Sequence, residues 1–184
     1  MALDSISLER IKTLHPKIRQ EVLDIYTHIN NKILGKGVRL RFAYTLRTNE
    51  EQDTLYAQGR TKLFDNNGKR LGIVTNAKGG QSIHNYGLAL DIVLLLDKNG
   101  DGTFETASWD TKADFDKDGT SDWKEVVTYF KSKGWVWGGD WKFVDAPHFE
   151  KTFGYNWKAL QSKMNDGEFT SEVVNGVKVK YPIL

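Results

Sequence analysis

Residues 82–96, with the sequence SIHNYGLALDIVLLL, decide the fold of this chain. From residue 88 onward the stretch is apolar at every position except Asp91, which predicts a buried central strand of a sheet. Burying an ionised carboxylate without a partner is costly, so Asp91 requires a cation nearby. His84 precedes it in the same stretch and is a candidate to share that cation. Two other histidines, His15 and His28, lie outside any such pattern and are expected to be structural.

Residues 145–150, with the sequence DAPHFE, supply a second imidazole at His148. Two imidazoles and one carboxylate leave one tetrahedral position for water, and catalytic zinc sites keep such a position open whereas structural sites fill all four. Asp145 stands three residues before His148, where a general base would accept a proton from that water. Because their spacing is odd, the two residues would face opposite sides of a regular strand. We therefore predict a turn or bulge at Pro147, which cannot donate to a ladder.

The remaining sequence predicts an α+β fold. Apolar residues at helical spacing fill residues 8–36, with Ser7 as the expected N-cap and Pro16 as the point where this helix divides. Thr48 and Glu51 match a capping box that opens the next helix. Helices are thus predicted at residues 8–36, 48–59 and 123–133, strands at 38–44 and 88–96, an extended segment at 135–150, and an irregular connection around 66–80.

Length and composition exclude several classes of protein. The chain has 184 residues, 39% hydrophobic and 27% charged, which suits a globular domain with its own core. It contains no run of about 18 apolar residues that would span a membrane. Its first ten residues lack the basic and apolar regions of a secretory signal peptide. The absence of cysteine excludes disulfides and cysteine zinc ligands.

Charge is distributed unevenly along the chain. Residues 97–125 contain nine acidic residues and four lysines, a local net charge of −5 within a chain of net charge +2. The rest of the chain therefore carries about +7. A basic body suits an anionic polymer as partner, and the acidic segment suits a bound cation. An uneven but merely solvated surface is the alternative for the basic part.

The acidic segment contains a calcium-binding pattern. Residues 114–125 match an EF-hand loop, with glycine at position six and glutamate at position twelve. Ser121 at position eight, where an aliphatic residue is usual, argues against paired EF-hand packing. The expected calcium ligands are Asp114, Asp116, Asp118, Thr120, Asp122 and Glu125. The alternative is a solvated acidic turn that binds no ion.

A first loop begins in the same way at Asp97, Asn99 and Asp101, but its twelfth position is Ser108. Its ligand set is incomplete unless it is completed from elsewhere, so calcium is expected there only as a second site. Since both loops lie between the predicted zinc ligands in the sequence, calcium would order the segment that leads to His148.

Taken together, the motifs resemble a known family. Ser82-x-His84 followed by Asp91, the segment WGGDW at residues 137–141, and Asp145-x-Pro-His-Phe-Glu are similar to zinc-dependent peptidoglycan peptidases related to D-alanyl-D-alanine carboxypeptidases. The resemblance covers residues 8–160. Within this family the chain is most similar to the L-alanyl-D-glutamate endopeptidases found among phage endolysins and some bacterial autolysins.

The resemblance implies a small single domain with a central antiparallel sheet flanked by helices, similar to D,D-peptidases and to the Hedgehog signalling domain. It implies zinc on His84, Asp91 and His148, and Asp145 as the catalytic acid and base. Arg47 occupies the position of an arginine that binds the polarised carbonyl. There the family pattern is nearer Gly-Tyr-Arg-Ser, so Leu46 and Thr48 depart from it.

Four further residues have supporting roles in this interpretation. Ser82 and Glu150 are expected to bond the ligand imidazoles or to hold the loop. Trp137 and Trp141 are expected to line the substrate groove, with burial in the core as the alternative. The zinc peptidase domain is expected to span residues 1–165, followed by a C-terminal hairpin appendage of residues 166–184 with an Asn-Gly turn.

The expected function is zinc-dependent hydrolysis of the L-Ala–D-Glu bond of peptidoglycan by an endolysin or autolysin. A D,D-carboxypeptidase or dipeptidase is the alternative of similar chemistry, and a non-catalytic zinc and calcium binding module is the alternative of another class. A calcium sensor is disfavoured because only one loop is complete. The expected partner is peptidoglycan, with no nucleic acid, no membrane insertion and a monomeric chain. Without a signal peptide, synthesis in the cytoplasm and release through a phage holin is the simplest route to the wall, or secretion with the signal removed.

Overall fold

The structure is a computed structural model that describes residues 3–184. Its contacts divide the chain into two compact units. The first consists of Met1–Thr45 with Leu88–Lys151, and the second consists of Leu46–Gly87 with Thr152–Leu184. Each unit is formed by two separate stretches of sequence.

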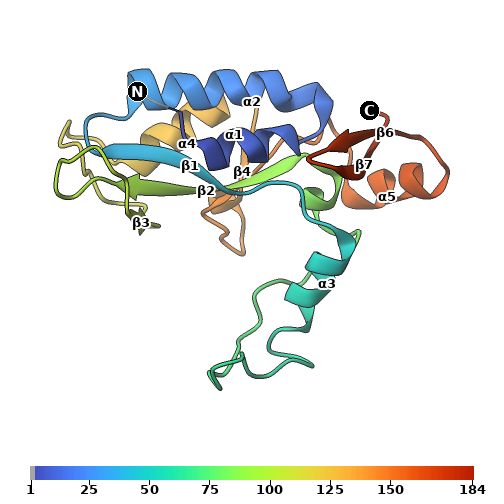
Figure 1. The fold of residues 1–184 in the computed structure, drawn as a ribbon. Coiled ribbons are helices and arrows are strands. Elements are labelled where there is room, and N and C mark those ends of the chain that lie inside the picture. The colour runs from blue at the N-terminus through green and yellow to red at the C-terminus, as the bar shows by residue number, and fades with distance from the viewer. Residues whose placement is uncertain (1–2) are drawn as a thin grey trace. The chain divides into compact units, whose positions relative to one another are not determined.

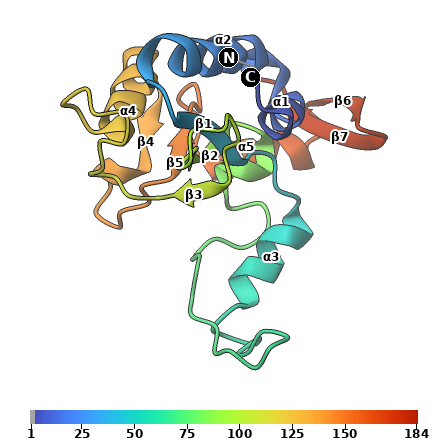
Figure 2. The ribbon, with the colours of Figure 1, turned by 60° about the vertical axis from the view of Figure 1, so that its left-hand side comes forward.

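The first unit is built on an antiparallel sheet. Its strands are β1 (Val38–Tyr44), β2 (Ala89–Leu96), β3 (Thr106–Ser108), β4 (Val136–Trp137) and β5 (His148–Glu150). They follow the order β1-β2-β5-β4, and β3 also pairs with β2, as can be traced in Figure 2. All pairings are antiparallel. The α+β class and the antiparallel sheet are therefore confirmed.

Strand β2 is the centre of this sheet, as predicted. It pairs with three other strands, and all of its residues are buried except Asp91, which is partly exposed. The ladder with β1 shifts register between Phe42 and Tyr44, so that Tyr44 stands opposite Asp91. The near-continuous apolar sequence of β2 thus corresponds to a strand covered on both faces.

Helices of the first unit are α1 (Ser5–Lys12), α2 (Pro16–His28) and α4 (Asp122–Ser132), and a π-helical segment, η1, covers Ile29–Ile33. Helices α1 and α2 lie over the same side of the sheet (Figure 1). Phe130 of α4 packs against Phe149 of β5, with ring centroids 4.6 Å apart. This packing anchors the strand that carries His148 in the core.

Pro16 divides the first helical stretch as predicted, because it begins α2 as the first helical residue. The predicted N-cap at Ser7 is wrong. Asp4 caps α1 by accepting a hydrogen bond from the backbone N–H of Ser7, while the buried Ser7 hydroxyl accepts from the backbone N–H of Phe42. The tertiary contact with β1 therefore uses the hydroxyl that would have made the cap.

The predicted extended segment 135–150 is correct only at its two ends. Between β4 and β5 the chain forms a 3-10 turn, η3 (Gly138–Asp140), and an exposed loop. The backbone N–H of Asp145 donates to the carbonyl of Gly138, so the chain folds back here. Strand β3, which has only three residues, was not predicted.

The second unit contains α3 (Asn49–Ala57), a 3-10 turn η2 (Ile83–Tyr86), α5 (Trp157–Asn165), and the hairpin β6 (Phe169–Val174) with β7 (Val177–Pro182). The capping box of Thr48 and Glu51 is confirmed at the start of α3. After α3 the chain is irregular and forms only isolated bridges, as predicted. Helix α5 was not predicted.

The predicted Asn-Gly hairpin is present, since Asn175 and Gly176 both have positive φ and connect the paired strands. The division into a domain of residues 1–165 and an appendage of residues 166–184 stays a prediction. Among the helices formed by residues 3–184, none combines the length and apolar character needed to cross a membrane.

Candidate metal centre and active site

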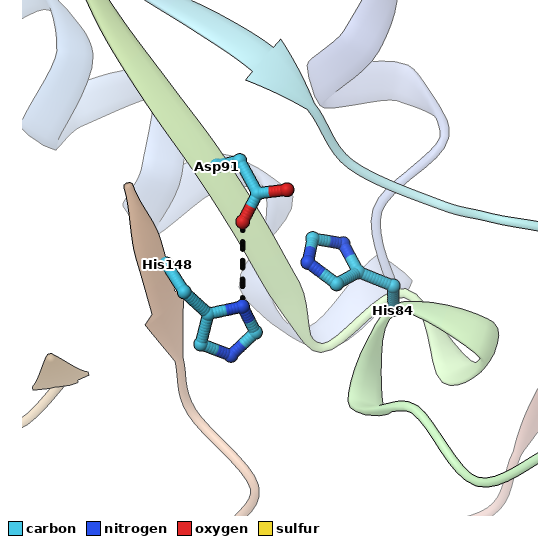
Figure 3. A group of neighbouring side chains, drawn as sticks. All are labelled: His84, Asp91 and His148. Atoms are coloured by element: carbon cyan, nitrogen blue, oxygen red, sulfur yellow. Dashed lines mark ion pairs between the residues drawn. The ribbon is translucent and has the colours of Figure 1, made fainter. Parts of the chain in front are cut away.

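Asp91 and His148 are brought together by strand pairing. They stand directly opposite each other in the antiparallel ladder of β2 and β5. Side chains of opposed residues lie on the same face of a sheet, within reach of each other. The Nδ1 atom of His148 lies 3.3 Å from Oδ1 of Asp91, as the dashed line in Figure 3 indicates. Two residues 57 positions apart thus form one end of a candidate site.

His84 joins this pair from the 3-10 turn η2. One ligand atom from each of His84, Asp91 and His148 lies within 4.8 Å of the others. Both imidazoles are buried and Asp91 is partly exposed. Figure 3 shows the two rings and the carboxylate directed toward one space. The structure therefore brings together the three residues that the sequence singled out as metal ligands.

The turn that carries His84 is held by its neighbours in the second unit. Ser82 and Asn85 form a reciprocal capping box across it, which is the loop-holding role expected for Ser82. The side-chain amide of Asn85 also donates to the carbonyl of Arg47, and the backbone N–H of Arg47 donates to the carbonyl of His84. Asn85 was missed by the sequence analysis, although the pattern Ser-x-x-Asn at a turn signals such a cap.

Arg47 is held through its guanidinium as well as its backbone. Its Nη1 donates to Oε1 of Gln52 at 2.8 Å, and Gln52 itself is fully buried in the second unit. The side-chain amide of Gln52 donates in turn to the carbonyl of Ala77. Gln52 was also missed, because nothing in a helical sequence distinguishes a buried glutamine from an exposed one.

Glu150 fixes the second nitrogen of His148. Nε2 of His148 lies 3.0 Å from Oε2 of Glu150, so the ring is held between two carboxylates. Burial lowers the pKa of His148, but the hydrogen bonds and charges of Asp91 and Glu150 outweigh it and raise the pKa to about 9. The predicted support of an imidazole by Glu150 is therefore present in the structure.

The donor set fits a divalent metal ion. Two imidazoles and one carboxylate are the three-ligand combination of catalytic zinc sites, and one ligand bonded to an outer carboxylate is typical of such sites. A metal at Nδ1 of His148 requires that nitrogen to be deprotonated, so binding would release the proton that the raised pKa retains. Nε2–H would then donate to Glu150.

Asp145 begins the turn that ends at His148. The backbone N–H of His148 donates to the carbonyl of Asp145, and Ala146 and Pro147 form the centre of the turn. The predicted turn at Pro147 is therefore confirmed. The Asp145 residue is exposed to solvent, which suits a group that exchanges protons with a substrate.

The two tryptophans of the WGGDW segment differ in exposure. Trp141 is 37% exposed, and its ring lies 5.0 Å from the ring of His148, centroid to centroid. Trp137 is half-buried in β4. Trp141 is thus partly exposed beside His148 and Trp137 is half-buried, and a groove-lining role for either residue stays a prediction.

The acidic loop of residues 114–125 gathers its carboxylates into two overlapping groups. Asp114, Asp116 and Asp122 form the first, and Asp116, Asp118 and Glu125 form the second. Asp122 is fully buried, and its Oδ1 has no hydrogen-bond partner; the same holds for the buried Oε2 of Glu125. Burial and the neighbouring carboxylates raise the pKa of Asp122 to about 6 and that of Glu125 to about 7.

In the loop that begins at Asp97, the carboxylates accept hydrogen bonds from the loop's own backbone N–H groups. Asp97 accepts hydrogen bonds from the backbone N–H groups of Gly100 and Gly102, and Asp101 accepts from Thr103. Asn99 bonds Asp101. Calcium at this loop stays a prediction.

Comparison with known proteins assigns the family. The family model for D-alanyl-D-alanine carboxypeptidase matches residues 75–151, which include all three candidate ligands. A peptidoglycan L-alanyl-D-glutamate endopeptidase of Bacillus subtilis (strain 168), CwlK, is 42% identical over 138 residues, which cover 74% of this chain and 72% of that protein. The chain belongs to the M15 peptidase family.

The fold agrees with this assignment. The crystal structure of an L-Ala D-Glu endopeptidase of Serratia marcescens, ChiX, matches with a TM-score of 0.52 over 83% of this chain and 91% of that chain. Sequence identity over that match is 19%, so the likeness concerns the fold. Members of the M15 family are metalloenzymes, and this chain is a metallopeptidase whose His84–Asp91–His148 group suits a metal ion.

Proposed function

We propose that this metallopeptidase hydrolyses the L-Ala–D-Glu bond in the stem peptides of bacterial peptidoglycan, with zinc as its metal. The observation that carries the proposal is the grouping of His84, Asp91 and His148. It occurs in a chain that is 42% identical to a peptidoglycan L-alanyl-D-glutamate endopeptidase. Two imidazoles with one carboxylate favour zinc over hard cations, which prefer oxygen ligands alone.

A bound zinc ion would supply Lewis acidity, which polarises a carbonyl and makes water more acidic. The protein would supply the rest of the chemistry. Asp145 would accept a proton from the attacking water and deliver it to the leaving amine. Arg47 would stabilise the oxygen on which negative charge develops. Glu150 would hold His148 in the tautomer that presents a lone pair at Nδ1.

The alternative reaction is removal of a terminal D-alanine, as the description of the matching family model suggests. Purified peptidoglycan digested with the enzyme separates the two by mass spectrometry. Cleavage between L-Ala and D-Glu detaches the rest of the stem and leaves alanine on the glycan, whereas a carboxypeptidase shortens each stem by one D-alanine. Loss of terminal D-alanine alone would contradict the proposal. Asp145→Asn is the inactive control.

We propose calcium as a second cation, bound by the loop of residues 114–125. Support comes from the two buried carboxylate oxygens of Asp122 and Glu125 that have no hydrogen-bond partner. Leaving such oxygens unsatisfied is costly, and the raised pKa values of Asp122 and Glu125 reflect burial first and the neighbouring like charges second. A hard dication with oxygen ligands would relieve both penalties. The ligands would come from Asp114, Asp116, Asp118, Thr120, Asp122 and Glu125.

We further propose that the chain acts at the cell wall as a monomeric, bacteriolytic endolysin or autolysin. The proposal is supported by the basic charge outside the acidic segment, because wall polymers are anionic. Light scattering after size exclusion would test the monomer. Turbidity loss of cells given the enzyme from outside, compared with cells whose membrane is permeabilised, would test the need for release through a holin.

A further inference from the structure

We infer that Trp137, Gly138 and Gly139 form a socket that holds the turn from Asp145 to His148, and that they act as positioning residues for the reaction. The inference rests on the proposed function, because holding this turn matters for the reaction only if Asp145 is the acid and base. All residues of the socket and the turn lie in the first unit. Two contacts with the turn carry the inference, and a third contact within the socket supports the first.

The first contact is a hydrogen bond from the Trp137 indole. Its Nε1 donates to the carbonyl of Ala146 at 2.7 Å, in the centre of the turn. The backbone of Trp137 pairs with Phe149 in the ladder of β4 and β5, and Phe149 is fully buried. The indole therefore reaches from a strand fixed in the sheet to the loop that precedes its partner strand. This hydrogen bond therefore ties the centre of the turn to strand β4.

The second contact is the close approach of Gly138. Its carbonyl accepts a hydrogen bond from the backbone N–H of Asp145 at 2.9 Å. A Cβ at this position would lie 2.5 Å from the carbonyl oxygen of Asp145 and 3.1 Å from Cβ of His148. Since the first of these atoms belongs to the backbone, any side chain at residue 138 would displace the turn. The requirement for glycine here comes from lack of space and not from backbone conformation, since residue 138 is not among the positive-φ positions.

The third contact concerns Gly139, which lies under the Trp137 ring. A Cβ at this position would lie 2.1 Å from a ring carbon, Cζ2. An added methyl group would force the indole to rotate, and Nε1 would then lose the carbonyl of Ala146. Gly139 thus acts through Trp137, and the two glycines have distinct tasks.

The consequence is a fixed geometry between the proposed acid/base and a metal ligand. Asp145 is bonded through its N–H to Gly138 and through its carbonyl to His148, so its backbone has little freedom to shift. A displacement of about 1 Å at a positioned catalytic group can reduce the rate by about 100-fold. The socket would therefore affect kcat more than KM, since its contacts are with the backbone of the turn that carries Asp145.

Two socket variants and two matched controls test the inference. Trp137→Phe removes the indole donor and retains an aromatic ring, and Gly138→Ala introduces the clash. Trp109→Phe changes an exposed tryptophan, and Gly72→Ala adds a methyl group with no atom within 4 Å. Each purified zinc-loaded enzyme is assayed for kcat and KM on a muropeptide. Each metal-free protein is titrated with Co²⁺, whose visible spectrum reports the ligand geometry.

We expect Trp137→Phe to lower kcat by about tenfold with KM nearly unchanged, and Gly138→Ala to lower it further, to about 100-fold. Both should weaken Co²⁺ binding or alter its spectrum, because the turn ends at His148. Both controls should match the wild type. If Gly138→Ala fails to fold, Trp137→Phe still decides, since it removes one hydrogen bond. Socket variants that equal their controls in kcat and in the Co²⁺ titration would overturn the inference.

The Co²⁺ titration also separates this inference from the proposed function. If the wild type does not cleave the L-Ala–D-Glu bond, the proposed function fails, whereas the titration still reports whether the socket holds His148. If the wild type cleaves that bond and the socket variants behave as controls, only the socket fails.

Discussion

The metal centre and the acidic loop of residues 114–125 both gather carboxylates, but they hold them differently. At the metal centre Asp91 and His148 are opposed in a strand ladder, and Glu150 fixes the far side of the imidazole. In the loop, Asp114 and Asp118 accept hydrogen bonds from the loop's own backbone N–H groups. The sheet shapes the Asp91–His148 pair, whereas the loop is shaped by its own sequence. This pair should keep its geometry without an ion because the ladder holds both residues, whereas the loop should change when an ion binds.

The most damaging change should be His148→Ala. It removes a metal ligand from the ladder and leaves Asp91 and Glu150 facing each other without the imidazole between them. We expect zinc to be lost and hydrolysis to fall below detection, while far-UV circular dichroism changes little because β5 remains paired. Metal analysis by plasma mass spectrometry measures the zinc. Retention of one zinc per chain would show that this ladder does not build the metal centre.

Asp145→Asn should be the next largest in effect. An amide cannot accept the proton from water, so we expect activity to fall by about 10²–10⁴-fold with zinc content and melting temperature unchanged. Steady-state kinetics on muropeptides and metal analysis check both parts. Substantial residual turnover would move the role of base to Glu150, and the proposed division between metal ligand and proton acceptor would be wrong.

The double variant Asp118→Ala with Glu125→Gln tests whether the loop of residues 114–125 binds calcium. In the wild type, calcium at about 100 times its Kd should stabilise the fold by about 2.7 kcal/mol, which corresponds to about 5–10 °C in melting temperature. The variant should lose this gain and some activity, with zinc content nearly unchanged. Differential scanning calorimetry with and without calcium measures the shift. If calcium moves neither the melting temperature nor wall digestion in the zinc-loaded wild type, the loop is only an acidic turn.

The last effect expected is a pH dependence of stability from the same loop. Folding raises the pKa of Glu125 from 4.5 to about 7 and that of Asp122 from 3.8 to about 6. Between these limits the folded chain binds more protons than the unfolded chain, so without calcium this contribution to stability falls as pH rises from about 4 to about 7. Calcium should remove the decline because it favours the ionised forms. Urea titrations at several pH values measure this decline in the free energy of unfolding. The double variant lacks the Glu125 carboxyl, so its decline should be smaller than that of the wild type, and an equal decline in both proteins would contradict the contribution of Glu125.

Much of the fold was predictable because its signals are local. The capping box of Thr48, the division of the first helical stretch at Pro16 and the Asn-Gly hairpin each depend on a few adjacent residues, and all three are confirmed. Errors arose where a distant contact competes with a local preference. The hydroxyl of Ser7 is engaged by Phe42, 35 residues away, so Asp4 caps the helix instead. Helix α5 was missed although Asn156 caps it through its side chain, and strand β3 was missed because its three residues are too few to show a pattern and are held by the ladder with β2.

By itself, the sequence determined which residues belong together chemically: a carboxylate within the apolar strand around Asp91 has few physical explanations other than a cation, and two histidines in short polar segments complete the donor set. Only the tertiary structure decided how these residues meet. Which residue of β5 stands opposite Asp91, and how Gly138 and Trp137 hold the turn before His148, depend on strand register and on close approach between distant segments. Such contacts leave no periodic signal in the sequence, because periodicity reports which face of an element is buried and not what that face touches.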